Sequence, residues 1–337
     1  MNRQNGIGGV AGISRRKFLG GVAAGAAFSI VPRHVLGGPG QVAPNSKTTL
    51  AVIGAGGQGQ IDLMNLIAFD EVRVVAVCDV NREGGGYISW DWGKGGEGRT
   101  GGREPARRLV DDHYAEKGGA SRGCKAYADY RELLEKEDVD AVVVATPDHS
   151  HAVITMAALK RRKHVYCEKP LTWSVAEARA VAEEARKAGV ATQLGNQGQA
   201  GEEDRVVREM ILDGAIGHVR EVHVAISARF WRYPALQGRP TDAPPVPDGL
   251  DWDLWLGPAA ERPYNPEYHP WTWRNWWDFG TGQLGDLGCH KLSTVFKALD
   301  LRHPTSVEAC STKMFPEVYP LGVIARFEFP ARGERPP

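Results

Sequence analysis

The sequence predicts an α/β protein, in which an N-terminal Rossmann domain with a doubly wound parallel sheet precedes an α+β domain with a mostly antiparallel sheet. Between residues 48 and 194, short β-branched and apolar runs alternate with helical segments. A glycine-rich turn at residues 54–59 directly follows the first of these runs. Beyond residue 218, apolar and polar residues alternate as in half-buried strands. We place the two domains at residues 45–197 and 198–337.

Length and composition are those of a two-domain globular protein. The chain has 337 residues, of which 42% are hydrophobic and 24% charged. Lys plus Arg and Asp plus Glu are both 41, so no basic field predicts a nucleic-acid partner. The five cysteines are odd in number and irregularly spaced, with no Cys-x-x-Cys pair. This pattern argues against a disulfide framework and against a structural zinc site.

Residues 1–44 are interpreted as a targeting signal and linker. Arg15 and Arg16, within the string SRRKFL, precede a mildly apolar run from Gly20 to Val31. That order is typical of a twin-arginine (Tat) export signal; an ordinary secretory signal or a basic tail is the alternative. No later run approaches the roughly 20 apolar residues that span a bilayer. We expect the Tat translocase as a partner during export, and a soluble periplasmic or otherwise exported product.

The glycine-rich turn carries the pattern Gly-x-Gly-x-x-Gly. A strand at Thr48–Ile53 precedes it, a helix at Ile61–Phe69 follows it, and a second strand at Val72–Val77 leads to Asp79. In this context the pattern predicts a dinucleotide-binding turn, with the phosphates at the helix N-terminus. Its members are Gly54, Gly56, Gly57, Gln58 and Gly59.

Each glycine of the pattern has a physical role. Gly54 permits the tight turn, Gly56 lets the backbone approach the pyrophosphate, and Gly59 lets the helix pack closely on the sheet. Asp79 is expected to accept hydrogen bonds from the ribose hydroxyls, which favours NAD. Arg82 lies close enough in sequence to meet a 2′-phosphate, which leaves NADP open.

The alternation of strands and helices continues to residue 194. The expected elements are a helix, a buried strand, a helix, a strand, a capped helix and a last strand, at residues 129–136, 139–145, 151–163, 164–167, 174–189 and 191–194. The stretch Glu83–Gly123 breaks the pattern and contains Trp90 and Trp92. We interpret it as a surface insertion, acting as a lid over the cofactor or as an oligomer contact.

Two strings leave the ends of neighbouring strands, where ligands bind in open α/β sheets. They are TPDHSH at residues 146–151 and CEKP at residues 167–170; a third string, GDLGCH at residues 285–290, carries an Asp-x-x-x-His pair. Together with the glycine turn, they resemble the Gfo/Idh/MocA oxidoreductases over roughly residues 48–330. The signal and the tryptophan-rich stretch resemble the family's exported, Tat-dependent bacterial subgroup.

The resemblance implies NAD(P)-dependent hydride transfer at a carbinol carbon of a sugar, glycoside or polyol. Lys169 would lie by the nicotinamide and hydrogen-bond the reacting oxygen, and His290 would accept the proton. Asp286 would orient His290 or hold a neighbouring hydroxyl. General acid–base chemistry needs such groups, and positions four apart share a helix face. The structural alternatives are an exposed charge pair at Glu168 and Lys169 and a helix cap at Asp286.

Further residues are assigned to the cofactor and the substrate. Those expected at the cofactor, besides the glycine turn, Asp79 and Arg82, are Thr146, Pro147, His151, Glu168, Lys169 and Pro170. Those expected at the substrate are His149, Asn196, Trp273 and Arg274. His149 and His151 could be metal ligands, but no third ligand has suitable spacing, so we predict no metal.

The second domain is expected to contain strands at Val219–Ser227, Thr305–Ser311 and Val323–Phe329. Seven of the ten tryptophans lie between Phe230 and Phe279. We expect most of them to pack the segment onto the domain and one or two to reach the substrate. Three strands are fewer than the family's second sheet normally has, so we expect this domain to be incomplete at the C-terminus.

Two other functions compete with a sugar or polyol dehydrogenase. One is an NAD-dependent glycosidase or lyase that oxidises a sugar transiently, although such relatives typically depart from the Glu-Lys-Pro string that this chain retains. The other is a non-catalytic sugar-binding module. We also expect a homo-oligomer.

Overall fold

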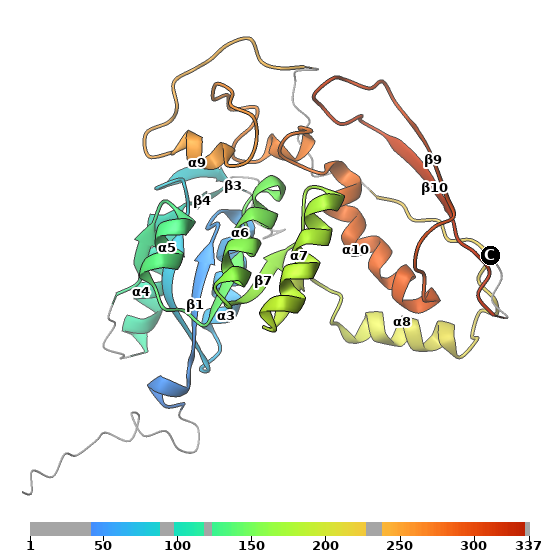
Figure 1. Ribbon diagram of the computed structural model, residues 1–337, viewed down its shortest axis with the longest axis horizontal. Helices are drawn as coiled ribbons and strands as arrows, with labels where there is room; N and C mark the ends of the chain where they lie inside the picture. The colour runs from blue at the N-terminus through green and yellow to red at the C-terminus, as the bar shows by residue number, and fades with distance from the viewer. Residues whose placement is uncertain (1–41, 88–97, 118–122, 227–237, 334–337) are drawn as a thin grey trace, which may run out of the picture. The chain divides into compact units, whose positions relative to one another are not determined.

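The computed structural model describes residues 42–87, 98–117, 123–226 and 238–333. The chain divides into two units, Met1–Lys47 and Thr48–Pro337. The first unit is described only from residue 42 and contains a short 3₁₀ helix, η1 (Pro44–Ser46). Both the Rossmann sheet and the second domain lie in the other unit, to which everything below refers (Figure 1).

The Rossmann domain contains a six-stranded sheet in which every pairing is parallel. In spatial order its strands are β5 (Lys125–Tyr127), β2 (Val72–Cys78), β1 (Thr48–Ile53), β6 (Ala141–Val144), β7 (His164–Glu168) and β8 (Thr192–Gly195). The strand order reverses between β1 and β6, which is the position where open α/β sheets bind ligands. The predicted Rossmann topology is confirmed.

Helices cover both faces of this sheet. They are α3 (Gly57–Ile67), α4 (Arg103–Glu116), α5 (Tyr130–Lys136), α6 (Asp148–Lys160) and α7 (Val175–Ala188). Strand β1 shows the division, because its side chains alternate between two cores. Leu50 and Val52 pack with residues of α3 and α4, whereas Ala51 and Ile53 pack with residues of α5, α6 and α7. The expected capping box at Ser174 opens α7.

The stretch Glu83–Gly123 is only partly an insertion. Strands β3 (Gly84–Tyr87) and β4 (Arg99–Gly101) form a small antiparallel hairpin, as an insertion would. The following α4, however, is a regular sheet-covering helix that buries Ala106 and Val110. Its charged sequence hides this role, since only a narrow apolar stripe marks the buried face. Trp90 and Trp92 lie outside the described residues.

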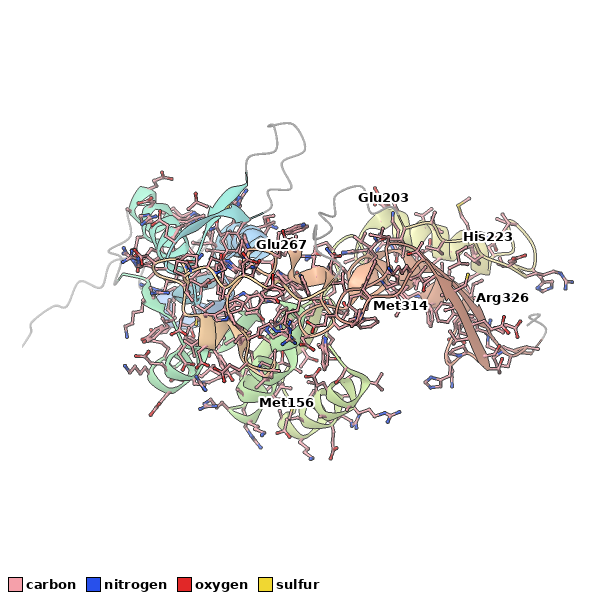
Figure 2. All side chains as sticks on the ribbon, turned by 90° about the horizontal axis from the view of Figure 1, so that it is seen from above. Met156, Glu203, His223, Glu267, Met314 and Arg326 are labelled. Atoms are coloured by element: carbon pink, nitrogen blue, oxygen red, sulfur yellow. The ribbon has the colours of Figure 1, made fainter. Side chains whose placement is uncertain are left out.

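The second domain contains α8 (Glu202–Leu212), α9 (Trp252–Leu256), η2 (Thr272–Asn275), α10 (Gly282–Leu299) and the hairpin of β9 (Ser306–Ser311) with β10 (Val323–Glu328). In Figure 2, Glu203 marks α8, and Met314 and Arg326 mark the hairpin segment. The hairpin is antiparallel, as predicted. The predicted strand at Val219–Ser227 is wrong over its described residues, 219–226, which form no strand. Alternation alone cannot make a strand without a neighbour to complete its hydrogen bonds.

The aromatic segment builds a core of its own. Its buried members are Leu250, Trp255, Leu256, Tyr264, Tyr268, Trp273, Trp276, Phe279 and Val318. Trp252 stacks on Trp255 with ring centres 4.6 Å apart, and the indole of Trp276 donates to the Glu267 carbonyl at 2.8 Å. The tryptophans of the segment that the structure describes are therefore used largely in packing. In the described part of the chain, no helix is long and apolar enough to cross a membrane.

Candidate active site

A cavity of about 810 Å³ lies at the carboxyl ends of the Rossmann strands and is lined on its other side by residues of the second domain. It brings together most of the residues that the sequence predicts: Gly54, Gly56, Gly57, Gln58, Asp79, Thr146, Pro147, His151, Glu168, Lys169, Trp273, Arg274, Asp286 and His290. Five predicted residues do not line it: Gly59, Arg82, His149, Pro170 and Asn196. The site thus combines strand ends with η2 and α10, which lie far apart in sequence.

The glycine turn has the backbone geometry of a dinucleotide-binding loop. Gly54 has a φ of +90°, in the region that favours glycine. A Cβ atom on Gly59 would lie 1.9 Å from the Gly54 carbonyl oxygen, so α3 can approach the turn only if residue 59 is glycine. Gly59 therefore acts through packing, in the role predicted for it, although it does not line the cavity.

Asp79 ties the end of β2 to the glycine turn. Its Oδ2 accepts a hydrogen bond from the Ala55 amide at 2.7 Å, and its Oδ1 accepts one from the Asn81 amide at 2.8 Å. Burial raises the pKa of Asp79, and these two hydrogen bonds oppose the rise. Each carboxylate oxygen keeps a second lone pair for a ligand hydroxyl.

Arg82 is not at the site. Its side chain is exposed and lies against Gly249, where an added Cβ would come within 3.0 Å of the Arg82 Cβ. In this position the Arg82 side chain does not reach the cavity where a 2′-phosphate would lie. The reason is local: the backbone amide of Arg82 donates to the Gly249 carbonyl at 2.8 Å, which holds this segment beside the second domain.

The cavity wall also offers an unused hydrogen-bonding group. The Thr146 hydroxyl is buried and has no hydrogen-bond partner among the described residues. A buried polar atom without a partner is costly unless a ligand or water satisfies it. With the glycine turn and Asp79, it fits a dinucleotide lying across the strand ends.

Lys169 and Asp286 connect the two domains inside the cavity. Lys169 follows β7, and its ammonium donates to the Asp286 carbonyl oxygen at 3.0 Å and also to Oδ1 of the Asp286 carboxylate. Both side chains are largely buried. Burial alone would raise the pKa of Asp286, but the charges of Arg274 and Lys169 outweigh it and hold that pKa below its usual value. Asp286 therefore stays ionised and fixes the position of the Lys169 ammonium.

His290 lies one helical turn beyond Asp286 on α10. Its Nδ1 lies 3.3 Å from the Gln197 carbonyl oxygen. Since a carbonyl only accepts, Nδ1 carries the proton in this contact and Nε2 keeps its lone pair. Burial and the charge of Lys169 lower the pKa of His290, so that its neutral form is favoured. The prediction that Asp286 orients His290 is corrected: Asp286 bonds to Lys169, and the Gln197 carbonyl holds His290.

The two histidines of the TPDHSH string have different surroundings. His149 is buried between α6 and the aromatic segment, with Nδ1 3.2 Å from the Phe279 carbonyl oxygen and Nε2 3.0 Å from that of Trp255. It does not face the substrate space, contrary to expectation, because both ring nitrogens lie against backbone carbonyl oxygens of the second domain, to one of which the neutral ring donates a hydrogen bond. Burial lowers its pKa to about 4.

His151 does line the cavity, as predicted. Its Nδ1 lies 2.6 Å from the Pro170 carbonyl oxygen and its Nε2 lies 2.8 Å from that of Thr146. Pro170 itself does not line the cavity, and its carbonyl oxygen acts only by contacting His151, which does. Burial lowers the pKa of His151 to about 4. These contacts join the strings that follow β6 and β7.

Asn196 turns away from the cavity. Its Nδ2 donates to the Cys289 carbonyl oxygen of α10 at 2.8 Å, and it is the next residue, Gln197, that lines the cavity. The substrate role expected for Asn196 is therefore replaced by a contact between domains. In the described ranges, no group of three or more His, Cys, Asp or Glu side chains is arranged to hold a metal ion.

Sequence reasoning missed Asp148. This carboxyl group lines the cavity, is buried, and accepts a hydrogen bond from the Thr281 hydroxyl at 2.6 Å. Burial, together with the negative charge of Asp286, raises its pKa to about 7. The available signal was its position in the turn that follows β6, at the first residue of α6 and two residues beyond Thr146.

Sequence reasoning also missed a tyrosine in the hairpin formed by β3 and β4. Tyr87 lines the cavity, and its ring occupies the space beside Gly56 that a Cβ would enter. Its hydroxyl lies 3.0 Å from Nε2 of His269, in the aromatic segment. This contact brings the hairpin and the second domain together over the glycine turn. Nothing in the glycine-rich string around Tyr87 indicates it.

Comparison with known proteins identifies the family. Residues 106–196 match the oxidoreductase family model for the NAD-binding Rossmann fold, and residues 200–318 match the model for the C-terminal alpha/beta domain of the same family. The chain belongs to the Gfo/Idh/MocA oxidoreductases. The NAD-binding Rossmann fold of this family agrees with the cofactor predicted from the glycine turn and Asp79.

Two relatives of this Gfo/Idh/MocA protein have named activities. It is 31% identical over 168 residues to a myo-inositol 2-dehydrogenase of Thermotoga maritima, covering 50% of this chain and 42% of the relative. It is 31% identical over 180 residues to a 1,5-anhydro-D-fructose reductase of Ensifer adhaerens, covering 52% of this chain and 53% of the relative. The chain thus spans about half the length of these curated relatives.

A solved structure shows the same fold. The WlbA dehydrogenase from Bordetella pertussis, in complex with NADH and UDP-GlcNAcA, superposes with a TM-score of 0.54 at 17% identity, covering 84% of this chain and 68% of that one. The likeness extends beyond the Rossmann sheet into the second domain.

Proposed function

We propose that this protein is an NAD(P)-dependent oxidoreductase that transfers hydride to or from a carbinol carbon of a sugar, glycoside or polyol. The observation that carries the proposal is the meeting of Lys169, Asp286 and His290 in one cavity at the ends of the Rossmann strands. The two named relatives, which act on inositol and on an anhydro sugar, support this class of substrate.

The side chains provide what alcohol oxidation requires. The bound nicotinamide would supply the hydride acceptor. A base must take the hydroxyl proton, and a donor must stabilise the negative charge that develops on the oxygen. Neutral His290 takes the proton at Nε2, while the Lys169 ammonium donates a hydrogen bond to the reacting oxygen. Asp286 holds the ammonium in place through its carbonyl and carboxylate oxygens.

The cofactor would be held by the chain's backbone and by two side chains. The glycine turn, from Gly54 to Gly59, takes the pyrophosphate at the N-terminus of α3. Asp79 accepts hydrogen bonds from ribose hydroxyls, which favours NAD, and the Thr146 hydroxyl gains the partner that it lacks. These groups bind and orient the cofactor and leave the proton chemistry to the other wall of the cavity.

Replacing the two proton-handling residues tests the proposal. His290→Ala and Lys169→Met should each reduce turnover by about 10²- to 10⁴-fold, because each removes one positioned proton-transfer group. Dinucleotide binding, followed by fluorescence titration, should survive both changes. Lys187→Met, in an exposed ion pair on α7, is the control and should leave turnover unchanged. Normal turnover in His290→Ala would remove His290 from the mechanism.

A transient-oxidation glycosidase is the second candidate. The chain is 31% identical over 156 residues to a glycosyl hydrolase family 109 protein of Stenotrophomonas maltophilia, covering 46% of this chain and 29% of the relative. The observation that favours this candidate is Asp148, since a buried carboxyl group with a pKa of about 7 can donate a proton to a leaving oxygen. Asp148→Asn should then abolish glycoside cleavage but spare net alcohol oxidation.

We further propose that the protein is exported through the Tat route to the periplasm. The support is the twin-arginine string followed by a mildly apolar run, at residues 14–31, which lie outside the described residues. The proposal agrees with a dinucleotide enzyme, because a protein that binds its cofactor in the cytoplasm must cross the membrane folded.

A further inference from the structure

Arg274 presents a buried guanidinium to the cavity. It lies in η2, its side chain is 16% exposed, and it lines the cavity with Trp271 and Trp273. The guanidinium carbon lies 3.8 Å from the ring centre of Trp271 and 4.1 Å from that of Trp273. Stacking on two indoles fixes the plane of the group, and Nη1 donates a hydrogen bond to the Trp271 carbonyl oxygen at 3.3 Å. The remaining N–H groups of the guanidinium are left for a ligand.

The backbone of Arg274 is equally fixed. A Cβ atom on Gly280 would lie 2.5 Å from the Arg274 carbonyl oxygen, so the two chain segments touch. The Gly280 carbonyl accepts a hydrogen bond from the Tyr319 hydroxyl at 3.1 Å, and the Gly280 amide donates one to the Trp276 carbonyl at 2.9 Å. A cation held this rigidly loses little freedom when it binds a ligand.

A second buried arginine of the same segment shows what a purely structural role looks like. Arg262 is 1% exposed and bonds directly to the Asp278 carboxylate, with Glu317 at 3.4 Å. It does not line the cavity. Two carboxylates therefore face Arg262, one of which, Glu317, also pairs with Arg239. Such pairing is expected for a buried cation that only stabilises the fold.

Arg274 lacks such compensation. Its nearest carboxylate oxygen, Oδ2 of Asp286, is 3.6 Å from Nε, which is beyond hydrogen-bonding distance. Asp286 is also shared with Lys169, whose ammonium bonds to its Oδ1. The other nearby carboxyl, Asp148, is about half protonated at neutral pH because burial raises its pKa to about 7. Positive charge is thus in surplus around Arg274.

We propose that Arg274 binds a carboxylate of the substrate, so that the substrate class is sugar acids rather than neutral sugars or polyols. The inference rests on the proposed function and narrows it. The planar guanidinium matches a carboxylate in bidentate geometry. A phosphate dianion fits less well, because Asp148 and Asp286 stand beside the same group and would repel a second negative charge.

The test compares ligands that differ only in this charge. D-glucuronate and D-galacturonate are each measured against their uncharged primary amides, by the kinetics of NAD reduction and by calorimetric binding to the NADH-loaded protein. Charge-assisted hydrogen bonds at a buried site correspond to about a ten- to one-hundred-fold preference. The acid should bind more tightly than its amide by that factor, mainly through KM. Equal binding, or tighter binding of D-glucose 6-phosphate, would overturn the inference.

Variants of Arg274 test whether this residue causes the preference for the acid over its amide. Arg274→Gln should bring the ratio of acid affinity to amide affinity close to one. Arg274→Lys should retain part of the preference, since an ammonium keeps the charge but cannot bind a carboxylate in bidentate geometry. Arg326→Gln, on the exposed strand β10 (Figure 2), removes the same charge and should keep the full ratio. If Arg274→Gln does not fold, Arg274→Lys takes its place in locating the preference, and the comparison of acid with amide on the unaltered protein still tests the preference itself.

The inference and the proposed function can fail separately. Reduction of NAD by neutral sugars, with no advantage for the acids, would leave the oxidoreductase in place and overturn the role of Arg274. Arg274-dependent binding of the acids without any NAD reduction would support the role of Arg274 and overturn the proposed oxidoreductase activity.

Discussion

Buried carboxyl groups distinguish this site from a surface charge cluster. Besides Asp148, Glu168 lies beside Asp62 of α3. Burial and the charge of the partner raise the pKa of Glu168 to about 8, while burial raises that of Asp62 to about 6. Glu168 accepts a hydrogen bond from Gln197, and Asp62 accepts one from Gln58 at 2.8 Å. With these pKa values the pair keeps about one proton at neutral pH, on Glu168, and this limits the repulsion between the two carboxyl groups next to Lys169.

Asp148→Asn should alter how stability depends on pH. The folded state holds a proton on Asp148 up to pH about 7, whereas the unfolded chain releases it near 3.8. Raising the pH through this window therefore destabilises the folded protein. The variant lacks this contribution and can still accept the Thr281 hydrogen bond. Its unfolding free energy should fall less between pH 5 and pH 8, by up to about 3 kcal/mol.

Urea unfolding at several pH values measures this difference. Asp138→Asn is the matched control, since the Asp138 side chain is exposed and pairs only with Lys163 among the described residues. Identical pH dependence in Asp148→Asn and the unaltered protein would show that Asp148 is not held in its neutral form.

At single residues, sequence reasoning succeeded where a motif fixes the backbone and was incomplete where side chains meet across the fold. Position after a strand is enough to bring Lys169 to the cavity. Position along the chain cannot predict that His151 lines the cavity and His149 does not. The surroundings of His149 are set by the carbonyl groups of Trp255 and Phe279, more than 100 residues away. The pairing of Asp286 with Lys169 instead of His290 likewise depends on how α10 meets β7.

At the level of elements, the strand–turn–helix of β1, the glycine turn and α3 is the unit on which cofactor binding depends. Gly59→Ala should disrupt it, because the new Cβ would lie 1.9 Å from the Gly54 carbonyl oxygen and the helix would have to shift. We expect a loss of about 1–3 kcal/mol in unfolding free energy, together with loss of NAD binding.

Gly85→Ala provides the control for this change. Gly85 lies in β3, and a Cβ there would meet nothing within 4 Å. This variant should unfold and bind NAD like the unaltered protein. The measurements are thermal unfolding and NAD titration; unaltered NAD binding by Gly59→Ala would contradict the role given to the turn.

Helices and strands could be predicted from the sequence where they contain a clear run or stripe of apolar residues. The buried strands β1, β2, β6 and β7 each contain three or more consecutive apolar residues, which is typical of strands in a parallel sheet. Helix α4 has two fully buried apolar residues in a charged sequence, and so was taken for part of an insertion. The run at 219–227 has the alternation of a strand, but pairing is a property of two segments, and alternation reports only one.

For the whole molecule, the proposed export route makes a direct prediction. Replacing Arg15 and Arg16 together with Lys should keep the precursor in the cytoplasm, because the translocase reads the arginine pair. Cell fractionation of the expressing host is the measurement, with Lys17→Arg as a control that leaves the pair intact. Periplasmic accumulation of the double variant would contradict the Tat assignment.

The two-domain organisation was predictable from the sequence, whereas the closure of the site was not. The Rossmann topology follows from the order of apolar runs and the glycine turn. The cavity itself depends on η2 and α10, and on Tyr87 meeting His269 across the glycine turn. Such contacts between distant segments leave no periodic signal in the chain.

Net hydride transfer from a carbinol carbon to NAD is tested most directly by the stoichiometry of that reaction. The purified protein is incubated with added NAD and a panel of sugars, sugar acids, polyols and glycosides, and reduced nicotinamide and oxidised product are quantified together. We predict equal amounts of the two, abolished in Lys169→Met. Cleavage of a glycoside with no net reduction of NAD would contradict the account and favour the transient-oxidation glycosidase.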